Sequence, residues 1–312
     1  MTEAKREKAH KLTIDELATF CKRKGFVYPN SEIYGGFSGF FDYGPLGVEL
    51  KNNVKQEWWK AHVQSRADVV GIDGSIITHP KVWEASGHVA HFTDIMAQCV
   101  KCSNKVRADH AVEDKLKITA AGMTASQLQE LMTKHKIRCP RCGGELKITQ
   151  PFNLMFKTFV GPSEGKEAET YLRPETAQLI FTNFRLVQEN ARMKLPFGIA
   201  QIGKAFRNEI APRDFLFRCR EFEQMEIEYF VHPNKIEQCP YIKEFEDYEL
   251  NVLTADMQKK QQQHKQMKIR EMLDKKNILP WHAYWLAFEH NWFVSLGANP
   301  GNLRIRQHVK EE

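Results

Sequence analysis

The sequence predicts an α+β fold built on an antiparallel sheet with helices packed around it. Strand-like and helical segments do not alternate regularly along the chain, which argues against a doubly wound parallel sheet. Residues 197–226 read as two strands joined by a loop, the pattern of an antiparallel hairpin. Residues 84–150 differ in texture, with paired cysteines, many Lys and His and few long apolar runs, and are expected to form a small inserted module.

Length and composition limit the class of protein. The 312 residues suffice for one large domain and a smaller module, and 42% of them are hydrophobic, so a sizeable core is expected. The net charge of +6 fits a polyanionic partner, although Lys and Arg that solvate helices would give the same balance. The N-terminus lacks the apolar stretch of a secretory signal, and no segment holds the ~18 apolar residues that cross a bilayer. A cytoplasmic protein without a membrane partner is therefore expected.

The N-terminal part, residues 1–83, is expected to contain two helices. Thr13 and Glu16 form a capping box, which predicts a helix that ends before Gly25. A stretch rich in glycine and aromatic residues follows and reads as a bent strand or loop. The next helix is expected over about 47–65, because apolar residues recur there at three- and four-residue spacing.

Trp58 and Trp59 are adjacent, so both cannot lie on the apolar face of that helix. One of them must pack elsewhere. It lies either against a second subunit or on a second buried side within the domain.

The C-terminal part, residues 151–312, returns to strands and short helices. Residues 197–203 alternate like a strand. Residues 255–278 are polar, rich in Gln and Lys and free of Pro and Gly, which predicts a solvent-exposed helix. Residues 281–296 are aromatic and predict a buried helix, so a helical insertion is expected near 240–296.

Two Cys-x-x-Cys pairs, Cys99 with Cys102 and Cys139 with Cys142, predict a structural zinc site in the module. The 36 residues between the pairs exceed the spacing of a compact ribbon, and a small helix over 126–132 accounts for the extra length. Four thiolates leave no open position on the ion, which favours a structural over a catalytic role. The alternative is a module whose cysteines hold no metal.

Residues 206–226 carry the mixture of groups that a nucleotide site needs. Arg207 can hold an α-phosphate with its planar fork, and Phe222 can stack on adenine. Glu209 can accept from an exocyclic amine, while Arg218 or Arg220 can hold the terminal phosphate. The alternative is a solvated ladder of ion pairs, against which the four-residue spacing of Arg, Phe and Glu from Arg218 onward argues.

Side-chain alternation adds a geometric expectation. On a strand, Arg207 and Glu209 would share one face, and Phe222, Gln224 and Glu226 would share a face of the next strand. The connecting loop, residues 210–217, would then fold over the substrates.

These motifs resemble a known family. Residues 206–226 resemble motif 2 of the class II aminoacyl-tRNA synthetases, and residues 40–47 with the following helix resemble motif 1 in glycyl-tRNA synthetases of the homodimeric type. Further matches run in family order along the chain, at residues 82–88, 107–109, 152–156 and 173–178.

The resemblance implies a class II-type antiparallel sheet flanked by helices, with motif 1 at the interface of a homodimer. It implies activation of glycine by ATP, helped by Mg²⁺, and transfer to tRNA(Gly). The implied ATP contacts are Arg207, Asn208, Glu209, Phe217, Arg218, Cys219, Arg220, Glu221 and Phe222, with Arg207, Glu209 and Arg218 as the catalytic residues. The implied glycine contacts are Arg107, Glu175, Phe222, Glu223, Gln224, Met225 and Glu226.

The residue chemistry agrees with that implication. A pocket crowded with carboxylates suits an ammonium group, and walls that exclude a methyl group select glycine, because every competing amino acid is larger. The reaction needs no protein nucleophile. The substrate carboxylate attacks the α-phosphorus, and the protein supplies positioning and charge neutralisation.

A third motif of the class, a glycine-rich strand that leads to an Arg at the start of a long helix, is not found. Residues 297–304 imitate it, but Pro300 would interrupt a strand, so a turn before a strand is expected there. Motif 3 and an anticodon-binding domain are therefore expected to be absent from the sequence.

Two rival interpretations remain beside the enzyme. One is a non-catalytic, synthetase-like nucleotide- or tRNA-binding module that keeps motifs 1 and 2, and the other is a zinc-ribbon nucleic-acid binder. The retained Arg207, Glu209, Arg218, Phe222 and Glu175 favour the enzyme, and the missing third motif favours the binding module.

Overall fold

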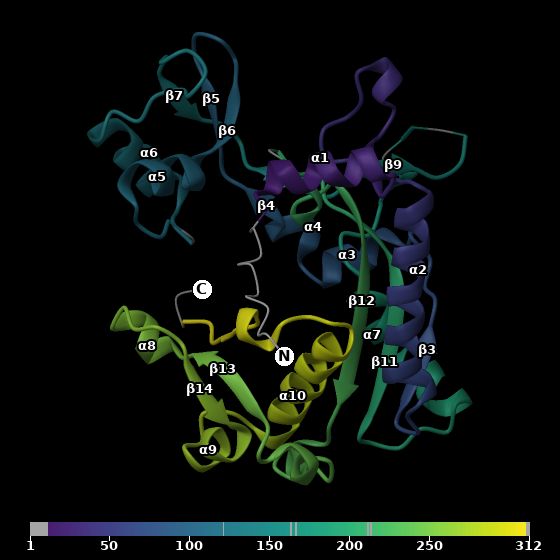
Figure 1. Cartoon of the computed structure of the whole chain (residues 1–312). Helices are drawn as coiled ribbons and strands as arrows, with labels where there is room; N and C mark the ends of the chain where they lie inside the picture. Colours follow the sequence, from purple (N-terminus) through teal and green to yellow (C-terminus); the bar gives the residue numbers. More distant parts are fainter. Residues whose placement is uncertain are drawn as a thin grey trace. The chain divides into compact units, whose positions relative to one another are not determined.

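The computed structural model describes residues 12–309 except 121, 163, 166, 211 and 213 (Figure 1). It is a mixed α+β structure with several small, mainly antiparallel sheets. The chain divides into two compact units. Residues up to 192 and residues 199–228 form the first, and residues 193–198 and those from 229 onward form the second.

The helices and strands of the first unit include a long helix, an inserted module and the hairpin strands. The α-helices are α1 (Ile14–Lys24), α2 (Pro45–Trp59), α3 (Pro80–Ala85), α4 (His88–His91), α5 (Ala108–Leu116), α6 (Ala125–Lys134) and α7 (Ala177–Asn190). The strands are β1 (Val27–Pro29), β2 (Phe41–Tyr43), β3 (Val69–Ile72), β4 (Thr93–Asp94), β5 (Met96–Cys99), β6 (Lys105–Arg107), β7 (Leu146–Ile148), β8 (Phe152–Asn153), β9 (Lys157–Phe159), β10 (Glu169–Tyr171), β11 (Phe197–Phe206) and β12 (Glu221–Phe230). Shorter helical turns are η1 (Glu32–Tyr34), η2 (Lys60–Gln64) and η3 (Phe215–Phe217).

The capping box predicted for the first helix is confirmed. The Glu16 backbone N–H donates to Thr13 Oγ1 over 3.2 Å, and the Thr13 backbone N–H donates to Glu16 Oε2 over 2.8 Å. Gly25 ends the helix with φ of 77°, a left-handed conformation that glycine adopts at little cost.

Helix α2 confirms the predicted long helix, but its α-helical part ends at Trp59 and a π-helical turn, η2, continues to Gln64. Trp58 is buried and stacks on His62, with 4.7 Å between the ring centroids. Trp59 packs against β3, where a Cβ added to Gly71 would lie 2.2 Å from the indole ring. The second tryptophan therefore has a buried side within its own unit.

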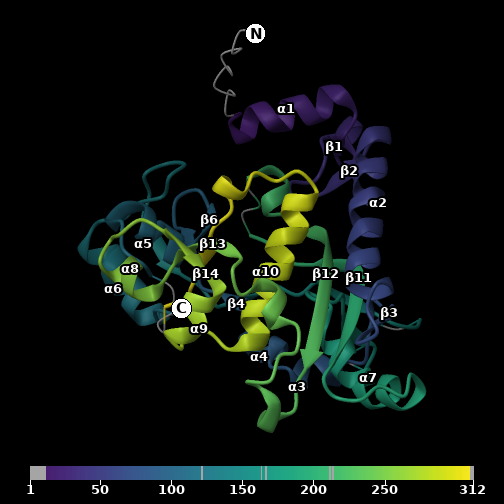
Figure 2. The same cartoon turned by 60° about the horizontal axis from the view of Figure 1, so that its bottom comes forward.

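The strands β12, β11 and β3 form a sheet in that order, and α2 lies beside it in Figures 1 and 2. The Arg207 backbone N–H donates to the Arg220 carbonyl over 2.8 Å and closes the predicted hairpin. Each hairpin strand has ten residues, longer than the sequence indicated. Since β11 ends at Phe206, Arg207 and Glu209 lie beyond the strand, and the expectation that strand alternation gives them a shared face was wrong.

The inserted module has its own sheet and its own core. Strands β6, β5 and β7 pair antiparallel in that order, and helices α5 and α6 contact each other and this sheet. The buried side chains are Ala97, Cys99, Ala108, Val112, Ala120, Leu128, Met132, Ile137, Cys139 and Leu146. At the root of the module, β4 pairs antiparallel with β8, which places Asp94 opposite Phe152.

The second unit contains α8 (Ala255–Lys259), α9 (Ile269–Asp274), α10 (Pro280–Ser295), β13 (Glu249–Leu253), β14 (Lys265–Lys268), β15 (Ile305–Arg306) and the turns η4 (Pro233–Lys235), η5 (Ile242–Phe245) and η6 (Pro300–Asn302). Strand β13 pairs antiparallel with β14 and parallel with β15. The predicted buried aromatic helix is confirmed as α10, and residues 297–304 form the expected turn before a strand.

The exposed helix expected over residues 255–278 was wrong. The segment folds as α8, β14 and α9 instead, so the insertion near 240–296 is mixed rather than helical. Met267 and Ile269 are buried on either side of the junction between β14 and α9, and β14 gains four paired positions with β13. This tertiary pairing outweighs the weak helical preference of a Gln- and Lys-rich composition.

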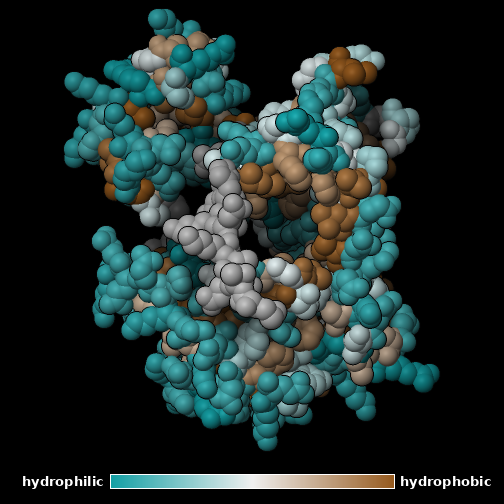
Figure 3. Space-filling view, in the orientation of Figure 1, coloured by the Kyte–Doolittle hydropathy of each residue, from teal (hydrophilic) through white to brown (hydrophobic). Residues whose placement is uncertain are grey.

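The face drawn in Figure 3 is mostly hydrophilic, with hydrophobic side chains gathered in patches. None of the helices within the described residues is both long enough and apolar enough to span a bilayer.

Candidate active site

Arg207 stands directly after β11 with its guanidinium beside two aromatic rings. The guanidinium carbon lies 5.3 Å from the centre of the Phe222 ring and 5.7 Å from that of Phe92. Its Nε donates to the Pro174 carbonyl over 3.1 Å. Within the described part of the chain, its two terminal nitrogens have no hydrogen-bond partner, so this cation is held in place with donors left for a ligand.

Glu209 and Arg218 pair with each other. Arg218 Nε and Nη2 lie 2.8 and 2.6 Å from Glu209 Oε2, and the Glu209 residue is 8% exposed. The two residues expected to contact the adenine amine and the terminal phosphate therefore share one charge-assisted contact across the ends of the hairpin loop.

The remaining residues of the expected ATP set line the hairpin loop. Arg220 Nε donates to the Glu209 carbonyl and its Nη1 to the Ser38 carbonyl, over 2.8 and 2.9 Å. The Asn208 backbone N–H donates to the Leu154 carbonyl, and the thiol of the buried Cys219 donates to the Leu216 carbonyl. Glu221 forms an ion pair with Lys204, and Phe217 is 78% exposed. Ala211 and Arg213 of the loop that was expected to cover the substrates lie outside the described residues.

Strand β12 separates the expected glycine contacts onto two faces. Phe222 contacts Arg207, and Glu226 accepts a hydrogen bond from the Thr176 hydroxyl. Glu223, one position from Phe222, instead forms ion pairs of 2.9 and 2.8 Å with Lys51 and Lys55 on α2. Met225 shares the parity of Glu223. The structure thus brings Phe222 and Glu226 to one side of the sheet and turns Glu223 to the other.

Three carboxylates gather near the start of α7. Burial, and then the charges of Glu226 and Glu175, raise the pKa of Glu228 above its ordinary value. Glu175 accepts from Gln178 Nε2 and lies 3.4 Å from His88 Nε2. Since like charges in a partly buried site repel, this carboxylate cluster (Glu175, Glu226 and Glu228) is suited to a cationic ligand.

Arg107 lies in a second charged group at the root of the module. It pairs with Asp94 over 2.9 Å and with Asp109 over 2.6 Å. Burial raises the pKa of Asp94 even though Arg107 opposes the shift. For Arg107, burial lowers the pKa, but Asp109, Asp94 and Glu209 outweigh it, and the guanidinium pKa is raised. Among the carboxylates that raise this pKa, Glu209 of the hairpin loop contributes least.

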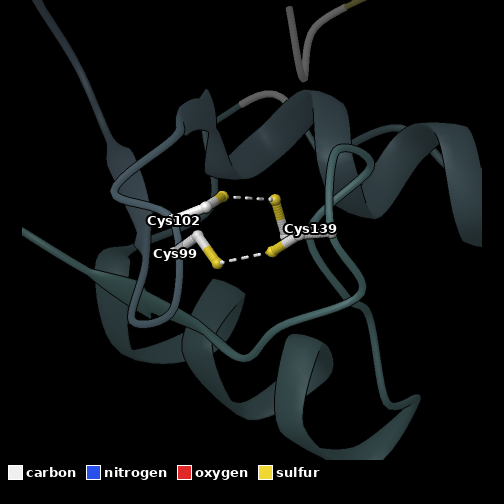
Figure 4. Close-up of side chains that lie close together, drawn as sticks. Cys99, Cys102 and Cys139 are labelled. Carbon is white, nitrogen blue, oxygen red and sulfur yellow. Dashed lines mark hydrogen bonds between the residues drawn. The ribbon is translucent and has the colours of Figure 1, made fainter.

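The four cysteines of the module converge. Their Sγ atoms all lie within 4.8 Å of one another, with 3.5 Å between Cys99 and Cys142 and 3.7 Å between Cys102 and Cys139. Figure 4 shows the labelled side chains pointing toward a common centre. A tetrahedral zinc ion with bonds of about 2.3 Å separates its sulfurs by roughly 3.8 Å, so the donor set fits this ion.

The thiol chemistry supports the same conclusion. Burial opposes ionisation of Cys99, but backbone N–H groups of Cys102 and Lys101 outweigh it and lower its pKa to about 6. The Asn104 backbone N–H favours the Cys102 thiolate, yet hydrogen bonds with the other cysteines and burial raise the pKa of Cys102 to about 12. Four thiolates so close together need a cation to ionise together.

Sequence reasoning missed several residues of the site. Glu228 follows Glu226 at the two-residue period of the strand, a signal that was available. Phe92 had no local signal, because it reaches the hairpin only through the fold. Thr176 lies within the matched segment 173–178 but was assigned no role.

Comparison with known proteins agrees with the resemblance to class II aminoacyl-tRNA synthetases. Residues 156–277 match the tRNA synthetase class II core domain (G, H, P, S and T). The glycine–tRNA ligase of Caldanaerobacter subterraneus subsp. tengcongensis is 44% identical over 308 residues, covering 97% of this chain and 58% of the relative. The glycine–tRNA ligase of Geobacillus thermodenitrificans is 43% identical over 306 residues, covering 96% and 57%.

The chain thus spans a little under three fifths of the length of these curated relatives. Among solved structures, the RNA-binding domain of threonyl-tRNA synthetase from Cryptosporidium parvum Iowa II covers 93% of this chain and 52% of that chain. The TM-score of this match is 0.45 and the sequence identity is 13%.

Proposed function

Because residues 156–277 match the class II tRNA synthetase core domain and the chain is 44% identical to a glycine–tRNA ligase over 97% of its length, we propose that it activates glycine with ATP and transfers it to tRNA(Gly). In this proposal the chain holds the base, the α-phosphate and the amino acid.

One observation carries the proposal. Arg207 lies 5.3 Å from the Phe222 ring, and the carboxylate cluster begins four residues farther along the same face of β12, at Glu226. With about 3.3 Å per residue, this face presents an aromatic ring, a cation and an acidic group within roughly 13 Å. Those three groups match adenine, phosphate and ammonium in that order.

The proposed reaction needs positioning and charge rather than a protein nucleophile. Arg207 binds the α-phosphate through its free terminal nitrogens, and Phe222 stacks on the base. Glu175 and Glu226 hold the glycine ammonium, which aims the glycine carboxylate at the α-phosphorus. ATP arrives as its Mg²⁺ complex, so the magnesium ion is counted with the substrate. Pyrophosphate leaves, and a tRNA hydroxyl then attacks the carbonyl of the adenylate and displaces AMP.

The proposal requires Arg218 to release Glu209. In the ligand-free pair each neutralises the other, and a terminal phosphate offers Arg218 a more highly charged partner. Glu209 is then free to accept from the adenine amine.

We also propose that the four-cysteine cluster holds a structural Zn²⁺, since the sulfur spacing fits a tetrahedral ion and the four ligands leave no position for substrate. The ion would anchor the zinc-ribbon-like module that carries Arg107. Metal analysis of the purified protein should find one zinc per chain. Cys139→Ser should lose it and lower the melting temperature, whereas Cys239→Ser, a buried cysteine outside the cluster, should retain the zinc.

The proposed assembly is a cytoplasmic homodimer formed through the motif 1 region. Large hydrophobic side chains are exposed within motif 1 and shortly before it in the single chain: Leu46 and Leu50, and the preceding Ile33, Tyr34 and Phe37, are between 53% and 87% exposed. A second subunit would bury such a patch.

Pyrophosphate exchange tests the activity. The full encoded protein should exchange labelled pyrophosphate into ATP when glycine is present, and Arg207→Ala should reduce ATP affinity about tenfold or more. Arg185→Ala, which removes an exposed arginine and its ion pair with Glu189 on α7, is the matched control and should leave ATP affinity unchanged. Absence of glycine-dependent exchange would refute the proposed enzyme activity and would favour a nucleotide- or tRNA-binding module instead.

A further inference from the structure

His88 contacts a serine hydroxyl through one ring nitrogen and Glu175 of the carboxylate cluster through the other. The His88 side chain is 13% exposed, and its Nε2 lies 3.4 Å from Glu175 Oε1. Its other ring nitrogen, Nδ1, lies 2.8 Å from the Ser86 hydroxyl oxygen. A hydroxyl, an imidazole and a carboxylate therefore stand in line, with the carboxylate at the end that belongs to the carboxylate cluster.

Two aromatic rings hold the imidazole. Its ring packs edge-on against Trp83, with 5.5 Å between centroids, and lies 5.3 Å from Phe92. Trp83 is fully buried. The Asn153 side chain donates to the carbonyls of His88 and Val89 over 3.1 and 3.0 Å, which holds the short helix α4 that carries the histidine. A ring held this way can set the direction of its partner.

The protonation chemistry favours a donor toward Glu175. When the Ser86 hydroxyl donates to Nδ1, the neutral ring carries its proton on Nε2, facing the carboxylate. When the hydroxyl turns to the Trp83 carbonyl, 3.3 Å away, a doubly protonated ring still points an N–H at Glu175. The remaining tautomer would set a lone pair against an anion and is disfavoured.

Glu175 is engaged through one oxygen. Both His88 and Gln178 approach Oε1, and within the described residues Oε2 has no hydrogen-bond or ion-pair partner. Two neighbours on the same oxygen fix the rotation of the carboxylate and leave the second oxygen directed at whatever enters the carboxylate cluster.

We propose that His88, supported by Ser86, is a positioning residue that orients Glu175 for the ammonium group of the amino acid substrate. The inference rests on the proposed function and deepens it. A cation held by two carboxylates is sensitive to the angle of each, so loss of the imidazole should weaken amino acid binding without touching the nucleotide.

The test is a set of substitutions measured by glycine-dependent pyrophosphate exchange on the full encoded protein. His88→Ala should raise the KM for glycine about tenfold, because Glu175 loses its contact with the imidazole, and should change the KM for ATP less than twofold. His88→Gln should bring the KM for glycine most of the way back to the wild-type value, because the Gln amide nitrogen can take the place of Nε2. His91→Ala removes an exposed histidine from the same helix and should change neither constant.

The contrary outcomes are distinct. If wild-type protein shows no glycine-dependent exchange, the proposed function falls and the inference falls with it. If wild-type protein is active and His88→Ala leaves the glycine KM unchanged, the inference alone falls. A parallel rise of both KM values with no rescue by Gln would assign His88 to structure only. Should His88→Ala not fold, His88→Asn, which can reach Ser86 but not Glu175, must raise the glycine KM relative to His88→Gln, or the inference is wrong.

Discussion

Glu223→Gln is expected to destabilise the protein and leave the KM for glycine unchanged. Glu226→Gln is expected to raise the KM for glycine and leave the stability unchanged. The Glu223 carboxylate lies 2.9 Å from Lys51 Nζ and 2.8 Å from Lys55 Nζ, both on α2. Glu226 accepts from the Thr176 hydroxyl and belongs to the carboxylate cluster on the other face of β12. Two equal chemical changes three positions apart thus probe the two sides of one strand.

The expected loss for Glu223→Gln follows from the burial of its two ion pairs. The side chains are 20% exposed for Glu223, 24% for Lys51 and 31% for Lys55, between a surface pair and a buried pair. Exposed pairs contribute up to about 1 kcal/mol, and hydrogen bonds to charged groups about 1.5–3, so a loss of about 1–2 kcal/mol is expected. That corresponds to a fall of roughly 2–6 °C in melting temperature.

The effect should depend on pH. Burial raises the pKa of Glu223, but Lys55 and Lys51 outweigh burial and lower it below its ordinary value of 4.5. The folded state then binds the proton less readily than the unfolded state, so the stabilisation is present above the unfolded pKa and is lost as pH falls through the folded one. The difference between wild type and Glu223→Gln should be full at pH 7 and should shrink below about pH 4.

The assay combines thermal unfolding followed by circular dichroism with the KM for glycine. High salt should reduce the stability difference, because these pairs are partly exposed. Glu226→Gln should raise the glycine KM about tenfold at an unchanged melting temperature. A raised glycine KM in Glu223→Gln, together with wild-type stability, would refute the placement of this carboxylate against α2.

Two further predictions concern the crowding around Gly203 and the titration of the Tyr171 phenol. Gly203→Ala should lower the free energy of unfolding by about 2–4 kcal/mol, because a Cβ there would lie 2.2 Å from Nη2 of the buried Arg173. Gly165→Ala is the control, because a Cβ there would have no atom within 4 Å. Equal urea midpoints for the two variants would contradict the crowding at Gly203. Burial and a 2.8 Å hydrogen bond to Glu169 raise the pKa of Tyr171 to about 12, so the stability that its phenol provides is complete below about pH 10 and is lost as pH rises toward 12. The advantage of wild type over Tyr171→Phe in urea should shrink across that window, and an ultraviolet titration midpoint at the ordinary tyrosine value would count against the burial argument.

The elements that could be predicted from the sequence are those with local physical signals. Thr13 and Glu16 satisfy each other within one helical turn, and Gly25 ends the helix by its own backbone freedom. The cysteine pairs could be assigned to one cluster because two thiolates with two residues between them can approach the same tetrahedral ion. Each of these signals lies within a few residues of the feature it predicts.

The parts that could not be predicted depend on distant partners. Residues 255–278 carry few apolar side chains, and only pairing with β13 determines that Lys265–Lys268 is a strand. The contact between Glu209 and Arg218 depends on how the hairpin loop closes. The position of Glu223, in contrast, was accessible: strand alternation already separates it from Phe222, and the family resemblance grouped residues that the pleat turns apart.

The pairing of β4 with β8 has a consequence for how this chain could have been assembled. Asp94 and Phe152 are partners across one antiparallel rung, where backbones lie about 5 Å apart, so the chain leaves and re-enters the main body of its unit at nearly the same point. The whole inserted module, with its four cysteines, could therefore be gained, lost or exchanged by recombination without disturbing the rest of that unit. Such an exchange would always carry Arg107 and Asp109 with it, so a lineage that discarded the module would have to find another cation for Asp94 at its root.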